Sequence, residues 1–262
     1  MADNLACLVI LAGVPVDRWV GRTGLFALAL VMALVLFGWL RRHRAMVRAR
    51  AAAVRGWFVP ALGLGAVAVF AKIADDVQDR ETTGIDRAVS LRFHELDSPA
   101  MDASMRAFTF LGSFPVILVV VIVAALWCLR RGDKRGAALV AAVAAFEELL
   151  NLVLKEAFRR TRPSLFEEIA TLHSYSFPSG HAMTAAAVYG AIAVLVARAR
   201  PERAAVAFAV SGILSFSIGA SRIYLGVHWL TDVLAGWSAG AFVLLVGVYL
   251  LARADARQSA GP

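Results

Sequence analysis

The segment AALVAAVAAFEELLNLVLKEAFRRTRP, residues 137–163, is an apolar run that ends in a cluster of basic residues. Its apolar part, 137–154, approaches the length of about 20 residues that a helix needs to cross a membrane. Further runs of near-spanning length occur at 24–40, 56–74, 114–129, 182–197, 204–221 and 229–252. The sequence therefore predicts an all-α protein, a polytopic bundle of transmembrane helices.

The composition supports an integral membrane protein. The chain has 262 residues, of which 60% are hydrophobic, and a mean hydropathy of +0.70. Soluble domains have about 45–50% apolar residues. The net charge of +8 comes without a nucleic-acid-binding motif or a lysine-rich tail, so we expect a membrane partner and no nucleic-acid partner. Arginine in loops that face an anionic leaflet accounts for the basic excess.

The distribution of arginine predicts the orientation. The segments 41–56, 130–135 and 198–203 are net basic, and the positive-inside rule places them in the cytoplasm. The segments 75–107, 155–181 and 222–228 then lie on the extracytoplasmic face. The acid-rich outer loop 75–107, with TFLGS at 109–113, either gates substrate access or forms a cap whose acids are solvated, and we expect the cap.

The basic cluster contains Lys155, Arg159, Arg160 and Arg162. Cations at a helix end often extend toward the membrane surface without any further function. The same predicted face, however, also carries SFPSGHAM, residues 176–183. A Ser-Gly step at a helix start leaves backbone N–H groups free for an anion such as phosphate. Alternatively, Ser179 only caps the helix and His181 only faces lipid headgroups.

A third block on this face is SRIYLGVHWLTD, residues 221–232. His228 and Asp232 are four residues apart, so on a helix the carboxylate can bind one ring nitrogen of the imidazole. The other nitrogen is then left unprotonated, as a nucleophile requires. A structural ion pair and half of a metal site are alternatives. We expect no metal and no cofactor, because His94 and His173 lie in outer loops and no further ligand completes a shell.

The three blocks together supply the parts of a phosphoryl-transfer site. The cations are Lys155, Arg162 and Arg222, the N–H donors belong to Ser179 and Gly180, and the reactive groups are His181, His228 and Asp232. Three cations can stabilise the charge of a phosphate without a metal. Two histidines allow one to attack phosphorus while the other protonates the leaving oxygen. These residues indicate metal-independent transfer through a phosphohistidine.

The same residues resemble the three signature motifs of the type-2 phosphatidic acid phosphatase superfamily. The matching positions are Lys155, Arg162 and Pro163, then Pro178-Ser179-Gly180-His181, then Ser221-Arg222, His228 and Asp232. The resemblance implies that His228 is the nucleophile, Asp232 its orienting carboxylate and His181 the acid and base. It implies a phosphate-binding role for Lys155, Arg162, Ser179, Gly180 and Arg222. Arg159 and Arg160 lie outside the fixed positions and are expected to meet headgroups or a second phosphate.

The resemblance also implies an architecture and a substrate class. We expect an N-terminal extension, 1–55, with one extra apolar helix and an Arg-rich cytoplasmic loop, a six-helix phosphatase core at 56–252, and a cytoplasmic tail at 253–262. The expected enzyme is a lipid phosphatase of the bacterial inner membrane, with its active site on the extracytoplasmic face. Its substrate would be a polyprenyl diphosphate, phosphatidylglycerophosphate, phosphatidate or a lipid A-type phosphate. The alternatives are a lipid phosphotransferase with the same intermediate and a non-catalytic lipid binder or transporter.

Three polar residues interrupt the apolar run of the opening segment. Glu147, Glu148 and Asn151 lie one to two helical turns before Lys155, and polar groups at that depth are usually functional. One hypothesis is that an acid orients Lys155 through Asn151. The other is that these side chains bridge to a neighbouring helix.

Overall fold

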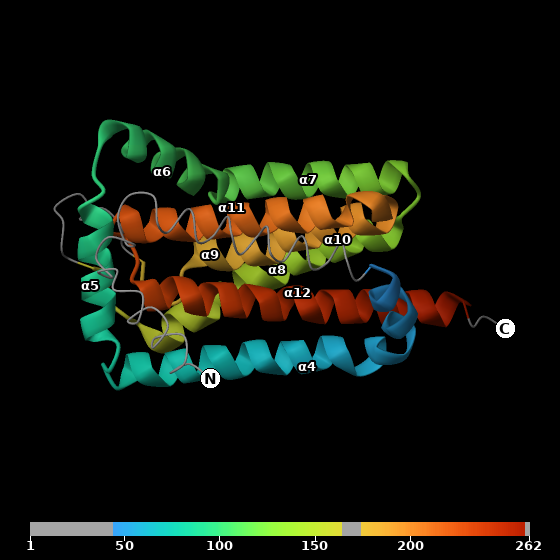
Figure 1. The fold of residues 1–262 in the computed structure, drawn as a ribbon, viewed down its shortest axis with the longest axis horizontal. Helices are drawn as coiled ribbons and strands as arrows, with labels where there is room; N and C mark the ends of the chain where they lie inside the picture. Colours follow the sequence, from blue (N-terminus) through green and yellow to red (C-terminus); the bar gives the residue numbers. More distant parts are fainter. Residues whose placement is uncertain (1–43, 164–173, 260–262) are drawn as a thin grey trace, which may run out of the picture. The chain divides into compact units, whose positions relative to one another are not determined.

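The computed structural model of the chain describes residues 44–163 and 174–259. By internal contacts the chain divides into two units, 1–49 and 50–262. The predicted apolar helix at 24–40 lies outside the described residues. Every regular element within them is a helix, which confirms the predicted all-α class (Figure 1).

The helices follow one another with short connections. Their bounds are α4 (Arg44–Gln78), α5 (Thr83–His94), α6 (Pro99–Leu111), α7 (Phe114–Arg130), α8 (Lys134–Phe158), α9 (Gly180–Thr184), one π-helical turn η2 (Ala185–Tyr189), α10 (Gly190–Ala199), a short 3₁₀ turn η3 (Pro201–Arg203), α11 (Ala204–Tyr224) and α12 (Leu230–Ser259). The elements α9, η2 and α10 form one continuous path, so the predicted run 182–197 is a single helical segment.

The long helices are suited to a membrane. Five helical segments of the described chain are long and apolar enough to cross one, at 57–78, 134–158, 180–199, 201–224 and 230–258. A sixth is possible if α6 and α7, which meet at an angle of 51°, form one broken span. These segments confirm the predicted polytopic bundle and match the predicted runs from 56 onward.

Two segments predicted as loops are helical instead. The Arg-rich segment 41–56 is part of α4 from Arg44 onward. The outer segment 75–107 consists mostly of α5 and α6, and α5 crosses the ends of the long helices (Figure 1). Ser98 caps α6 by accepting a bond from the N–H of Met101 at 3.4 Å, and Pro99 occupies the first helical position, where proline is favoured.

Close packing of α9 against α12 sets the relative positions of two predicted motifs. A Cβ on Gly236 of α12 would lie 2.6 Å from the carbonyl oxygen of Ser179, and one on Gly240 would clash with the carbonyl of Met183. Small residues at this spacing let two membrane helices approach closely. The backbone N–H of Ser179 also donates to the carbonyl of Asp232 at 2.9 Å. The glycines therefore allow the start of α9 to lie directly against the start of α12, where this hydrogen bond joins them.

Ion pairs join the helix ends at the opposite side of the bundle from α5. Asp255 of α12 accepts bonds from Arg198 at 2.6 Å and from Arg135 at 3.1 Å. These arginines belong to or border the basic segments that the positive-inside rule assigns to the cytoplasm. The basic connections and the helix ends near α5 thus lie at different ends of the described helices.

Candidate active site

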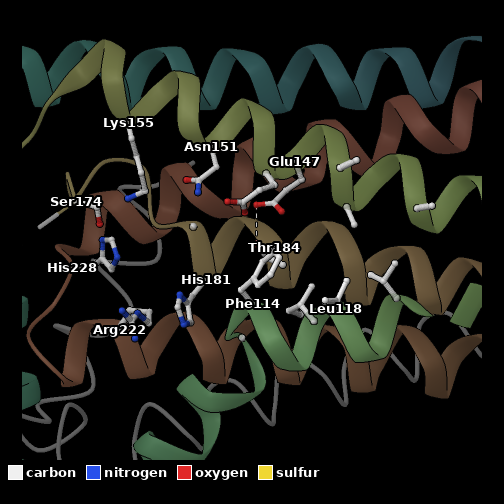
Figure 2. Close-up of a pocket in the computed structure, with 18 of the residues that line it drawn as sticks. Phe114, Leu118, Glu147, Asn151, Lys155, Ser174, His181, Thr184, Arg222 and His228 are labelled. Carbon is white, nitrogen blue, oxygen red and sulfur yellow. Dashed lines mark hydrogen bonds between the residues drawn. The ribbon is translucent and has the colours of Figure 1, made fainter. Parts of the chain in front are cut away.

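A cavity of about 590 Å³ opens near the ends of the long helices (Figure 2). Six of the eight predicted site residues line it: Lys155, Arg162, Gly180, His181, Arg222 and His228. Ser179 and Asp232 are fully buried behind this wall. The structure therefore brings the three sequence blocks together at one place.

His228 lies in the connection between α11 and α12. The chain turns there at Gly226, whose φ of 66° is in the left-handed region that favours glycine. Asp232, in the first turn of α12, accepts a bond from the N–H of Trp229 at 2.9 Å, which fixes its carboxylate. The Nδ1 atom of His228 lies 3.4 Å from Oδ2 of the same carboxylate. The predicted i, i+4 pair is therefore present, and only 2% of His228 is exposed.

Arg162 contacts the other nitrogen of this imidazole. Its Nη1 atom lies 3.2 Å from Nε2 of His228. A guanidinium has donors and no acceptor, so Nε2 must accept and Nδ1 must carry the proton. Burial, followed by the charges of Arg222 and Arg162, lowers the pKa of His228 well below its usual value. The imidazole is neutral, with its lone pair directed at the guanidinium.

Backbone carbonyls hold the two cations of the basic cluster that line the cavity, Lys155 and Arg162. The helix α8 ends at Phe158, and Arg159 takes the left-handed conformation with a φ of 47°. Beyond this turn, Arg162 donates to the carbonyls of Ser174 at 2.8 Å and Val227 at 2.7 Å. Lys155 donates to the carbonyl of Tyr175 at 2.6 Å. These carbonyls orient the two charged groups toward the cavity without neutralising them.

The structure corrects the prediction that the backbone N–H of Ser179 is free. Its backbone N–H is not free for an anion, because it donates to Asp232, and its hydroxyl makes no capping bond. The Ser179 hydroxyl is buried without a hydrogen-bond partner among the described residues. The first backbone bond of α9 runs from the N–H of Met183 to the carbonyl of Ser179. The N–H groups of Gly180 and His181 precede it, at the positive end of the helix dipole.

The junction of α6 and α7 covers the remaining part of the pocket. Thr109 accepts a bond from Nη1 of Arg222 in the last turn of α11, and Nε of Arg222 has no partner among the described residues. A Cβ on Gly112 would lie 3.0 Å from the ring of His181. The segment 109–113 therefore packs directly on two predicted site residues.

Two residues that contact the predicted site were not predicted from the sequence. Arg160 donates to Oδ1 of Asp232 at 2.6 Å and to Oδ2 of Asp86 at 2.7 Å. Asp86, on α5, also accepts from the N–H of Thr231 at 3.0 Å and from its hydroxyl at 2.7 Å. The expectation that Arg160 meets headgroups and that the acids of 75–107 are solvated is therefore wrong for this pair. Only 1% of Asp86 is exposed, and it belongs to a buried network behind His228.

Arg159, next to Arg160, has different surroundings. It is exposed and pairs with Glu156 at 3.4 Å on the protein surface. The two adjacent arginines therefore differ fully in their roles. One binds the carboxylate beside His228, and the other forms a solvent-exposed pair of little energetic weight.

In the described part of the chain, no hydrogen bond joins Glu147, Glu148 or Asn151 to Lys155. Glu147 accepts a bond from the hydroxyl of Thr184 at 2.8 Å, which links α8 to α9 (Figure 2). Asn151 has an oxygen with no partner among the described residues. The first hypothesis, that an acid orients Lys155 through Asn151, finds no contact to support it, whereas the bridge to a neighbouring helix is present.

Comparisons with known proteins agree with the motifs. Residues 136–255 match the PAP2 superfamily. The chain is 34% identical over 182 residues to phosphatidylglycerophosphatase B of Bacillus subtilis, a match that covers 68% of this chain and 88% of the relative. It is 36% identical over 117 residues to a lipid A 1-phosphatase of Rhizobium johnstonii, covering 41% of this chain and 45% of the relative.

A solved structure is similar along most of its length. It is the crystal structure of a transmembrane PAP2-type phosphatidylglycerolphosphate phosphatase from Bacillus subtilis. The TM-score is 0.67 at 30% sequence identity, over 74% of this chain and 96% of that one. The fold, the signature residues and the long match to a relative agree, and this chain is thus a member of the PAP2 superfamily.

Proposed function

We propose that this protein is an integral-membrane lipid phosphatase that works through a phosphohistidine at His228. One contact supports this most directly. The neutral imidazole of His228 presents its unprotonated nitrogen to a cationic pocket, 3.2 Å from Arg162. A phosphate group bound by that guanidinium would lie within reach of the lone pair.

The first step forms a bond from Nε2 of His228 to phosphorus and breaks the bond from phosphorus to the lipid oxygen. The electron pair of the broken bond goes to the leaving oxygen, which takes a proton from His181. Asp232 stabilises the positive charge that develops on the imidazole, through Nδ1–H. Lys155, Arg162 and Arg222, together with the N–H group of Gly180, bind the phosphate oxygens.

The second step restores the enzyme. His181, now neutral, accepts a proton from water while the water oxygen attacks phosphorus. The nitrogen–phosphorus bond breaks, its electron pair returns to Nε2, and inorganic phosphate leaves. Histidine is suited to both roles because an imidazole can both donate and accept a proton. All the groups in this cycle are side chains and backbone of the protein, so the proposed reaction needs no metal.

Arg160 acts as a positioning residue in this mechanism. It binds Oδ1 of Asp232, while Oδ2 faces the imidazole. The same Nη1 atom of Arg160 also donates to the hydroxyl of Thr231 at 2.8 Å, and Nη2 donates to Asp86 at 2.7 Å. The carboxylate is thus fixed by bonds at both oxygens, which sets the orientation of His228.

The lipid nature of the substrate is supported by the walls of the cavity and by the relatives. Phe114, Leu118 and several alanines of α8 continue the cavity away from the cations. The relatives are named phosphatidylglycerophosphatase and lipid A 1-phosphatase. We further propose a bacterial inner-membrane location with the active site on the extracytoplasmic face, because the basic connections lie at the other end of the helices.

A turnover panel tests this function. The purified full chain in detergent is offered phosphatidylglycerophosphate, phosphatidate and a polyprenyl diphosphate, and inorganic phosphate is measured. Release of phosphate from at least one lipid, above the rate of the His228→Gln variant, is expected. No release from any of them, with folded protein, would contradict the proposal.

A further inference from the structure

The middle of the cavity has a polar wall that the phosphoryl-transfer steps do not use. Asn151, Glu148 and Glu147 of α8 all line the cavity that also contains Lys155. Along a helix axis they lie about 6 to 12 Å from Lys155, at 1.5 Å per residue. Figure 2 shows Asn151 and Glu147 following Lys155 along α8, with His181 and Thr184 across the cavity. Any leaving group that extends from the phosphate toward the apolar part must pass this wall.

Asn151 lies where the phosphate pocket joins the deeper cavity. A Cβ on Gly180 would lie 2.8 Å from the amide nitrogen of Asn151, so the amide packs directly on the start of α9. The Asn151 side chain is 7% exposed, and its oxygen has no partner among the described residues. Buried polar atoms are nearly always hydrogen-bonded in folded proteins. The amide oxygen of Asn151 is therefore an acceptor to which the described residues donate no hydrogen bond.

The carboxylates beyond Asn151 add acceptors to the same wall. Glu147 is 1% exposed and uses one oxygen to accept the hydroxyl of Thr184 at 2.8 Å. Glu148 is half-buried and also lines the cavity. Carboxyl oxygens accept hydrogen bonds, and those of Glu147 and Glu148 can accept more than the one bond from Thr184. A lipid that filled the cavity would displace water, so the lipid itself would have to donate hydrogen bonds to these oxygens.

The next part of the cavity is apolar. Phe114, Leu118, Ala141 and Ala145 line it, and Phe114 and Leu118 are exposed at the helix surface. The cavity thus presents cations, then hydrogen-bond acceptors, then an apolar wall. A lipid that matches this order of groups carries a phosphate, then a hydrogen-bond donor, then a hydrocarbon chain.

We propose that this acceptor wall, formed by Asn151, Glu147 and Glu148, selects lipid phosphates that carry a hydroxyl or amide N–H within a few bonds of the phosphate. A glycerol hydroxyl or an amide-linked acyl chain supplies such a donor. A polyprenyl chain is hydrocarbon from its first carbon, and it would bury the acceptors unpaired, which is costly. The inference rests on the proposed function, because it names the substrate class of the same site.

A matched pair of lipids tests the selection. Oleoyl lysophosphatidate has a hydroxyl beside the phosphate-bearing carbon, and in its deoxy analogue a propanediol replaces the glycerol. The kcat/KM of the full-length protein is measured for both in the same mixed micelles. We expect the hydroxylated lipid to be preferred about tenfold, the factor that corresponds to one buried hydrogen bond.

Variants assign the preference to the wall. Asn151→Leu or Glu148→Met, whichever removes the acceptor of that hydrogen bond, should bring the ratio of the two kcat/KM values close to one. Glu156→Met is the matched control, because Glu156 is an exposed acid of the same helix outside the cavity, and it should keep the ratio. A ratio that stays at its wild-type value in both wall variants would overturn the assignment.

The kcat/KM values of the wild-type protein test the inference even if the variants are unstable. Equal kcat/KM for the two lipids would overturn the inference while leaving the phosphatase function intact. Hydrolysis of neither these lipids nor any lipid of the turnover panel would instead overturn the proposed function, and the inference with it.

Discussion

The guanidinium of Arg162 lies 3.2 Å from Nε2 of His228 and can only donate there. This contact determines the tautomer of the imidazole, whose proton must then be on Nδ1, facing Asp232. It also places the group that would bind a phosphate beside the nitrogen that would attack it. The two residues come from segments that are 66 positions apart in the sequence.

The buried, neutral state of His228 predicts a pH dependence of stability. The folded pKa is lowered, mainly by burial, whereas an unfolded histidine titrates near 6.5. As the pH falls through 6.5, the unfolded chain takes up a proton that the folded chain does not, so folding stability falls. From about pH 7.5 to 5.5 this loss is about 1.4 kcal/mol for one residue.

Unfolding in detergent of the wild type and of His228→Gln, at both pH values, measures this contribution. The variant has no titrating group at this position. Between pH 7.5 and 5.5 it should therefore lose about 1.4 kcal/mol less stability than the wild type. The same pH dependence in both proteins would contradict a lowered folded pKa.

The network behind Asp232 predicts opposite results for two adjacent arginines. Arg160→Gln removes the charged partner of Asp232 and Asp86, and kcat should fall by about 10 to 100-fold, as for other residues that orient a reactive group. The KM should change little, because Arg160 does not line the cavity. Arg159→Gln changes an exposed pair and should leave kcat within about twofold.

Two further variants distinguish the loss of a positioning residue from a general loss of protein stability. Arg160→Lys keeps the charge and should recover part of kcat, and Asp86→Asn should lower kcat in the same direction as Arg160→Gln. An unchanged kcat in folded Arg160→Gln would show that the network does not position His228.

The approach of α9 to α12 predicts a strong effect of one methyl group. Gly236→Ala would place a Cβ 2.6 Å from the carbonyl of Ser179 and must push the helices apart. Thermal stability and kcat should both fall, because the displaced helix ends contain Ser179, at the start of α9, and Asp232, at the start of α12. Gly65→Ala on α4 is the control, with nothing within 4 Å of the new Cβ. Equal stability of the two variants would argue against the close contact.

A site built from side-chain cations predicts specific responses to inhibitors. Chelation by EDTA should leave the rate of phosphate release unchanged. Vanadate should inhibit competitively, because it mimics five-coordinate phosphorus and transition-state analogues bind tightly. Activity that is lost in EDTA and returns with an added metal would contradict the metal-independent mechanism.

The sequence predicted correctly those features that depend on the spacing of residues close together in the chain. Apolar runs predicted the long helices, and the four-residue step from His228 to Asp232 predicted their contact. The segment 44–56 was misassigned because its arginines suggested a loop, although alanine and arginine both favour helix. Its alanine content was the signal that could have corrected the prediction.

Long-range contacts were beyond the reach of pattern analysis. Asp86 and Arg160 are 74 residues apart, and Asp86 is one of several acids in the segment 75–107 that look alike in the sequence. Arg159 and Arg160 also look alike, and the left-handed turn at Arg159 directs them to different surroundings. The bond from the N–H of Ser179 to Asp232 likewise depends on how two helices pack.

Trapping the covalent intermediate tests the central claim most directly. The protein is mixed with a lipid phosphate that carries radiolabelled phosphorus, quenched within the first turnover, and analysed for label on the chain. The account predicts an acid-labile, alkali-stable label on the peptide that contains His228, and neither label nor phosphate release in folded His228→Gln. Label on another residue, or substantial phosphate release by His228→Gln, would contradict it.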